Sequence, residues 1–333
     1  MLRKATWTLS VALPAALWLA VGASGQPTRR PSSRRPRPKK GQPDTKGRKP
    51  TVRRPGPADG KGPGVYELMK LYEARKYHSL QGDMPYRLLR PKAYAARVKY
   101  PMVVCLHGVP GRGKENTLQL AATYPVRVLA RPEMRAKHPC FVLAPQSRTW
   151  WGDRPYGSLP GAKASSKDYP AMTLMLNCVE SLQDVFSIDP NRIYVTGHAM
   201  GAFGLFNALR SDPDFFAAGV AVSGGGDPNA SAAFFHTPVW LFAGEKSPIR
   251  HYSETMVAAL RKFGGTPKYT MVAGAGTTCW IQVFDGQATW DWLFAQRKVP
   301  RPIPLTTLPT TLPTTLPAIP AIPVAPKLPA KTK

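Results

Sequence analysis

The chain has 333 residues, of which 46 are lysine or arginine and 19 are aspartate or glutamate, giving a formal net charge of +27. Its four cysteines are widely spaced, without a C-x-x-C motif or a Cys/His cluster, which excludes the usual zinc-binding patterns. Both ends differ in composition from a globular domain, so residues 65–298 remain for one domain with a substantial core.

The first 25 residues have the pattern of a secretory signal peptide. Arg3 and Lys4 precede an apolar stretch from Trp7 to Val21, and small residues follow it. A single membrane anchor is the alternative, but the stretch is shorter than the roughly 20 residues that a spanning helix needs. We therefore expect a secreted, periplasmic or cell-surface protein.

Residues 26–64 form a basic, proline-rich segment with 13 lysines and arginines, 2 acidic residues and 9 prolines. A segment with so few apolar side chains cannot offset the entropy of ordering, so we expect a disordered linker. In an exported chain its charge favours an anionic polysaccharide or lipid surface as partner, and no specific nucleic acid is expected. A solvated linker without a partner is the alternative.

Between residues 65 and 298, short apolar runs alternate with helical patterns. Runs that are apolar throughout and stop at Gly or Pro are typical of strands buried on both faces. Alternating strands and helices predict an α/β fold with a mostly parallel central sheet and helices on both faces. The sequence predicts strands at 84–91, 100–108, 138–145, 192–197, 217–225, 237–244 and 267–274, and helices at 170–187, 199–210, 252–263 and 287–297.

Residues 299–333 repeat TTLP three times and AIP twice, and they contain ten prolines. This composition excludes helix and sheet and favours a disordered, polyproline-like spacer.

The segment GHAMG, residues 197–201, lies between a predicted strand and a predicted helix. That is the setting of the G-x-S-x-G nucleophile elbow, in which a serine occupies a strained strand-to-helix turn. Here the middle residue is Ala199, which carries no nucleophile. Ligands of parallel sheets bind at the carboxyl ends of the strands, where GHAMG and the segments LHGVPGRG, GGGDP, GEKSPIR and GAGTTCW are expected to meet.

These motifs and their order resemble the α/β-hydrolase superfamily, in particular secreted single-domain esterases such as polyhydroxybutyrate depolymerases, feruloyl esterases and predicted peptidases. The resemblance covers nearly all of residues 77–298 and includes YPMVVCLHGVPGRGKEN, DPNRIYVTGHAMGAFG and PVWLFAGEKSPI. It implies the α/β-hydrolase fold and ester hydrolysis through a serine, a histidine and a carboxylate.

Carried over by position, the resemblance places the nucleophile at Ala199, the acid at Ser247 and the histidine at Thr277. None of these side chains can perform the implied role, because alanine cannot form an acyl-enzyme and threonine cannot transfer protons near neutral pH. The three vacancies lie in separate motifs whose flanking residues are retained, so a misaligned motif does not explain them. A catalytically inactive esterase homologue is the favoured hypothesis.

The resemblance also implies an oxyanion hole formed by the backbone amides of Val109 and Met200. Pro110 stands where the family usually has glycine, and this proline removes one amide and fixes φ in the loop.

Other residues near the predicted edge are candidates to replace the missing triad. His198 precedes the elbow position and is expected to line the ligand pocket, together with Trp280. His107 is expected to hydrogen-bond within its own loop, and Cys279 lacks a neighbouring histidine in sequence. Asp227 is a candidate for a relocated acid but has no base to act with, and His251 is expected to be a surface residue. Trp150 and Trp151 are candidates to stack a sugar or aromatic group, with packing as the alternative. No cofactor or metal site is expected.

Two hypotheses follow from the sequence. The first is an exported, inactive α/β-hydrolase-fold protein that binds an unknown ligand in the former active-site cleft or has a structural role. The second is an active carboxylic-ester hydrolase that uses non-standard catalytic residues.

Overall fold

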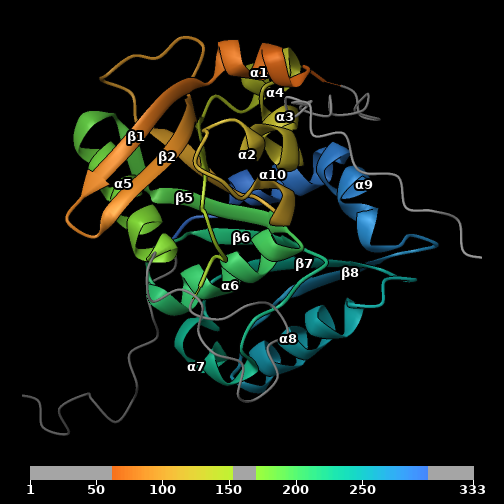
Figure 1. Cartoon of the computed structure of the whole chain (residues 1–333). Coiled ribbons are helices and arrows are strands. Elements are labelled where there is room, and N and C mark those ends of the chain that lie inside the picture. Colours follow the sequence, from red (N-terminus) through yellow and green to blue (C-terminus); the bar gives the residue numbers. More distant parts are fainter. Residues whose placement is uncertain (1–61, 153–169, 299–333) are drawn as a thin grey trace, which may run out of the picture. The chain divides into compact units, whose positions relative to one another are not determined.

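A central sheet of eight strands organises the part of the chain that this computed structural model describes, residues 62–152 and 170–298 (Figure 1). These residues belong to one unit, Arg54–Lys333. The predicted signal peptide, nearly all of the basic linker and the proline-rich tail lie outside the described residues.

The sheet has the order β1-β2-β4-β3-β5-β6-β7-β8. Strands β3 to β8 run parallel, and β1 and β2 add an antiparallel edge next to β4. The predicted α/β class with a mostly parallel sheet is therefore confirmed. The strands are β1 (Glu73–Ser79), β2 (Gly82–Leu89), β3 (Tyr100–Leu106), β4 (Phe141–Pro145), β5 (Ile188–His198), β6 (Ala218–Val222), β7 (Val239–Gly244) and β8 (Lys268–Val272).

Helices cover both faces of the sheet and divide the core into two clusters. On β3, Met102 and Val104 pack toward the cluster that includes side chains of α5, α6 and α8. Val103 and Cys105, the alternate residues, pack toward the cluster that includes α1, α3, α9 and α10. Both clusters are apolar because alternate residues of a strand point to opposite faces, so a strand covered on both faces is apolar at every position.

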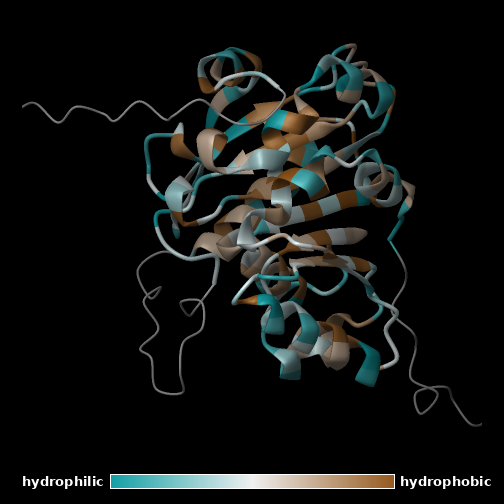
Figure 2. Ribbon diagram, turned by 90° about the vertical axis from the view of Figure 1, so that its right-hand side faces the viewer, coloured by the Kyte–Doolittle hydropathy of each residue, from teal (hydrophilic) through white to brown (hydrophobic). Residues whose placement is uncertain are grey.

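Hydrophobic residues gather along the strands, whereas hydrophilic residues lie on the outer helices (Figure 2). The helices are α1 (Val65–Leu71), α2 (Leu118–Ala122), α3 (Tyr124–Leu129), α4 (Pro132–Lys137), α5 (Ala171–Val185), α6 (Met200–Ser211), α7 (Ser231–Phe234), α8 (Arg250–Lys262), α9 (Trp280–Asp285) and α10 (Gln287–Ala295), with the 3-10 turns η1 (Val109–Gly111), η2 (Pro228–Ala230) and η3 (Thr277–Cys279).

All four cysteines are buried and free, as expected for apolar thiols. In the described ranges, every helix is too short or too polar to cross a membrane.

Candidate functional site

The turn between β5 and α6 holds Ala199 in a conformation that is uncommon for a residue with a side chain. Its φ is 48° and its ψ is −119°. The turn is fixed on both sides, because the Ala199 amide donates to Val222 O at 2.9 Å and the Ala199 carbonyl accepts from the amide of Ala202 at 2.9 Å. The backbone is thus a strained strand-to-helix turn of the kind that the GHAMG motif predicts.

Both glycines of this motif are required by close backbone contacts. A Cβ at Gly197 would lie 2.4 Å from the carbonyl carbon of Gly201, and a Cβ at Gly201 would lie 2.1 Å from Leu106 O. The start of α6 therefore packs directly on the carboxyl end of β3. At the apex of the turn the side chain is a single methyl group.

The loops after β7 and β8 bring Ser247 and Thr277 together. The two hydroxyl oxygens are 3.2 Å apart, and Ser247 is buried. Ser223 links Thr277 to the elbow side of the sheet. Its hydroxyl donates to Thr277 O at 3.2 Å, and the preceding residue, Val222, accepts from the Ala199 amide. Two neutral hydroxyls thus face each other at this edge of the sheet.

The loop after β3 forms η1, in which Val109 is the first residue and is 40% exposed. Pro110 lies in the first turn of η1, where an amide has no partner within the turn, so its missing N–H does not disturb the loop. Among the described residues, neither the Val109 amide nor the Met200 amide has a hydrogen-bond acceptor. Both amides therefore remain available as donors.

His107, which lies in the LHG motif, is held inside the structure by two hydrogen bonds. Its Nδ1 lies 2.8 Å from Gly108 O, and its Nε2 accepts from the Ser147 amide at 2.9 Å. Burial lowers the pKa of the His107 imidazole to about 4. The predicted role in loop hydrogen bonding is confirmed, and both ring nitrogens are used.

His198 packs flat against Trp280, with ring centroids 4.6 Å apart and an interplanar angle of 22°. The side chain is 7% exposed, and its Nδ1 has no hydrogen-bond partner in the described part of the chain. Burial lowers the pKa of the His198 imidazole to about 4, so the ring is neutral at physiological pH. A Cβ at Gly108 would lie 3.5 Å from His198 Nε2, which places the ring beside the η1 loop.

Cys279 is buried, and its sulfur is 3.3 Å from the hydroxyl of Ser223. Burial raises the pKa of this thiol, which disfavours the reactive thiolate. All six histidines lie in the described ranges, and none of them has a ring nitrogen hydrogen-bonded to a described serine, threonine or cysteine side chain. The nucleophile–base pair that hydroxyl or thiol catalysis requires is missing from these residues.

The other sequence candidates have local structural contacts. Asp227 accepts from the Asn229 amide at 3.0 Å and thereby caps η2, and His251 is an exposed residue that packs on Tyr252. Trp151 is buried and donates to His107 O at 3.0 Å, whereas Trp150 lies under the guanidinium of Arg112. No described group of three or more His, Cys, Asp or Glu side chains is arranged to hold a metal ion.

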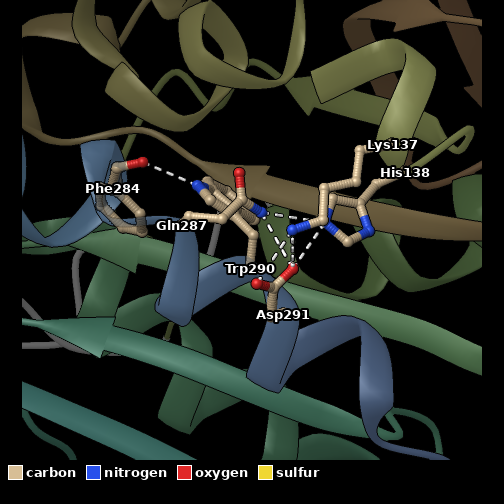
Figure 3. Close-up of polar contacts among 6 residues, drawn as sticks. All are labelled: Lys137, His138, Phe284, Gln287, Trp290 and Asp291. Carbon is tan, nitrogen blue, oxygen red and sulfur yellow. Dashed lines mark hydrogen bonds and ion pairs between the residues drawn. The ribbon is translucent and has the colours of Figure 1, made fainter. Parts of the chain in front are cut away.

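A polar cluster between α4 and α10 was not predicted from the sequence. The Asp291 carboxylate binds the amine of Lys137 at 2.8 Å and the amide of Gln287 at 3.0 Å, and it lies 3.2 Å from His138 Nε2 (Figure 3). The His138 ring also stacks on Phe294, with centroids 4.4 Å apart. These contacts join two segments that are distant in sequence, so the cluster has a structural role.

No protein-family model and no curated protein matches the chain in sequence. Among solved structures, a thermostable esterase is 30% identical with a TM-score of 0.64, and the match covers 70% of this chain and 64% of the esterase. The chain thus spans less than two thirds of that protein.

Two feruloyl esterases are similar in fold. The feruloyl esterase module from Clostridium thermocellum, complexed with sinapinate, is 13% identical with a TM-score of 0.52, and the match covers 74% of this chain and 97% of the module. A ferulic acid esterase from Anaeromyces mucronatus, in complex with ferulic acid, is 13% identical with a TM-score of 0.50 and coverages of 68% and 90%.

Proposed function

Because this chain belongs to the α/β-hydrolase superfamily and carries alanine at the apex of its elbow, we propose that it is a catalytically inactive esterase homologue with a binding or structural role. The observation that carries the proposal is the elbow itself. Its backbone keeps φ and ψ values of 48° and −119°, yet the side chain at Ala199 is a methyl group.

The surroundings of Ala199 support the same proposal. Ser247 and Thr277, at the positions that the family resemblance gives to the acid and the base, form a pair of hydroxyls 3.2 Å apart. Such a pair can neither accept a proton near neutral pH nor stabilise an imidazolium. Loss of a complete triad lowers turnover by roughly a millionfold, which leaves only the contribution of binding and the oxyanion hole.

Ligand binding at this edge of the sheet is the proposed remaining role. The backbone amides of Val109 and Met200 have no described acceptors, and the neutral His198 ring, which packs on Trp280, lies beside the η1 loop that contains Val109. These groups provide hydrogen-bond donors beside an aromatic surface. None of them is a nucleophile that would attack an ester. Export of the chain, with residues 26–64 contacting an anionic polysaccharide or lipid surface, is part of the proposal and rests on the sequence pattern alone.

The test is turnover of activated short-chain esters by the purified full-length chain and by two variants, His198→Ala and Cys279→Ala. We expect turnover no higher than that of a denatured control, and no difference among the three proteins. Turnover that is lost in either variant would instead establish an active hydrolase with non-standard residues. Binding of the chain to anionic vesicles or acidic glycans, lost at high salt and on removal of residues 26–64, tests the surface contact separately.

A further inference from the structure

A groove of about 770 Å³ lies beside α1 and α4, and none of its lining residues belongs to the elbow or to the loops after β7 and β8. The helices α1, α3 and α4 stand together above the sheet in Figure 1. The volume is within the range of about 300–1,000 Å³ that small-molecule pockets have. The groove is therefore large enough for a small molecule.

The lining combines an apolar floor with basic side chains. Apolar groups come from Leu71, Ala130 and Pro132, among others, and the charged lining residues are Lys70, Lys92, Arg131 and Arg135 against Glu67 and Glu133. Glu67 is occupied by the Gly64 amide, which donates to its carboxylate at 2.8 Å. Among the described residues, Lys70, Lys92 and Arg135 have no carboxylate partner.

Two guanidinium groups at the groove have a buried donor that is not satisfied. Arg131 binds Asp285 through Nη2 at 2.7 Å, and Arg135 donates from Nη2 to Arg90 O at 3.2 Å. The Nε atoms of both side chains are buried and have no hydrogen-bond partner within the described ranges. Arg131 Nε lies at the groove rim, because a Cβ at the lining residue Gly62 would be 3.2 Å from it. Because both Nε atoms are covered by protein, the donors that the groove offers to a ligand are the exposed amines of Lys70 and Lys92 and the remaining N–H groups of Arg135.

From these observations we propose that the groove binds a single-chain carboxylate amphiphile, such as a long-chain fatty acid. The carboxylate accepts from Arg135 and is neutralised by Lys92 and Lys70, and the alkyl chain lies on the apolar floor. Planar guanidinium groups suit carboxylates because they donate in a fork geometry.

Charge and shape disfavour the chain's own ends as occupants. Residues 26–61 carry 13 basic and 2 acidic residues, so their charge is of the same sign as that of the basic lining. The proline-rich residues 299–333 would dock as a polyproline helix, a mode that uses aromatic-lined grooves, and no described lining residue is aromatic.

The test is a fluorescence titration of the full-length chain with dansyl-undecanoic acid, followed by displacement with laurate or with 1-dodecanol, all below their micelle-forming concentrations. We expect saturable binding, and displacement by laurate at concentrations at least tenfold lower than by dodecanol. Equal displacement by the two compounds, or no binding, would overturn the proposal.

Variants locate the site. Arg135→Met is expected to weaken binding about tenfold or more and Lys92→Met severalfold, whereas Lys262→Met, with the same change of charge on α8, and Ala199→Leu, which fills the elbow, leave it unchanged. Because Lys92 is exposed, Lys92→Met is expected to fold normally. It therefore tests the site even if Arg135→Met proves unstable. Loss of binding in Ala199→Leu with retention in Lys92→Met would assign the ligand to the elbow. If the chain binds only anionic vesicles, and Lys92→Met does not weaken that binding, the basic surface contacts a membrane. Each of these two results would refute the proposal that the groove binds a carboxylate amphiphile.

Discussion

Ala199 keeps a backbone conformation that costs free energy, although no reactive side chain needs it. A non-glycine residue with φ of 48° and ψ of −119° is held by its surroundings, at a cost of about 1–3 kcal/mol. In an active esterase the same strain presents a nucleophile. Here the strain follows from the packing of β5 against α6, because the close backbone contacts of Gly197 and Gly201 fix the course of the chain between the two elements.

A glycine at this position relieves the strain. We therefore expect Ala199→Gly to raise the free energy of unfolding by about 1 kcal/mol, since the gain in the folded state exceeds the added entropy of the unfolded chain. Urea denaturation measures the change. The matched control is Ala208→Gly in the interior of α6, which is expected to lower stability by about 1 kcal/mol or more. Equal destabilisation by both changes would contradict the account of strain at Ala199.

The sequence predicted the residues around this turn better than their contacts. The elbow and the bonding of His107 follow from short motifs, because each motif determines a local backbone path. The stack of His198 on Trp280 and the hydroxyl contact of Ser247 with Thr277 join segments that are distant in sequence. Such contacts depend on strand order, and no local pattern specifies them.

At the scale of elements, the strand–turn–helix unit of β5 and α6 positions the site against β3. Helix α6 begins so close to β3 that its second residue must be glycine, since a Cβ at Gly201 would lie 2.1 Å from Leu106 O. The unit is therefore a rigid part of the core whether or not a reaction occurs there.

The substitution Gly201→Ala is expected to lower the free energy of unfolding by more than about 2 kcal/mol, because the added methyl group meets backbone that cannot move aside. Gly276→Ala is the control, since a Cβ added there would meet no atom within 4 Å and the φ of Gly276 is −88°. Thermal or urea unfolding compares the two variants. A Gly201→Ala protein as stable as the control would show that the turn can relax.

Strands that are continuous apolar runs were predicted correctly, whereas a charged strand and helices of one or two turns were missed. Strands β3, β4 and β7 are apolar runs that stop at turn residues, and they were found near their true bounds. Strand β1 was missed because its sequence, EARKYHS, is charged and lies at the sheet edge. Helices α2, α3 and α4 have only 5 or 6 residues each, too few for a helical period to be recognised.

For the molecule as a whole, two buried neutral histidines make stability depend on pH. Burial lowers the pKa of both His107 and His198 to about 4. Between pH 6.5 and 4 the unfolded chain binds these protons and the folded chain does not, so stability is fully present near pH 7 and is lost as the pH falls. At pH 5 each histidine lowers the free energy of unfolding by about 2 kcal/mol relative to pH 7.5.

The variant His198→Leu removes one of these groups. We expect its loss of stability between pH 7.5 and pH 5 to be about 2 kcal/mol smaller than in the unmodified protein, as measured by urea denaturation at the two pH values. An unaltered difference in His198→Leu would mean that the pKa of this imidazole is the same in the folded and the unfolded protein.

The central claim, that the fold keeps the elbow without its chemistry, is tested most directly by fluorophosphonate labelling followed by intact-mass measurement. The full-length chain is compared with the triple variant Ala199→Ser, Ser247→Asp, Thr277→His. We expect no adduct on the unmodified chain and a single adduct at position 199 of the triple variant. An adduct on the unmodified chain, lost when His198 or Cys279 is replaced by alanine, would contradict it.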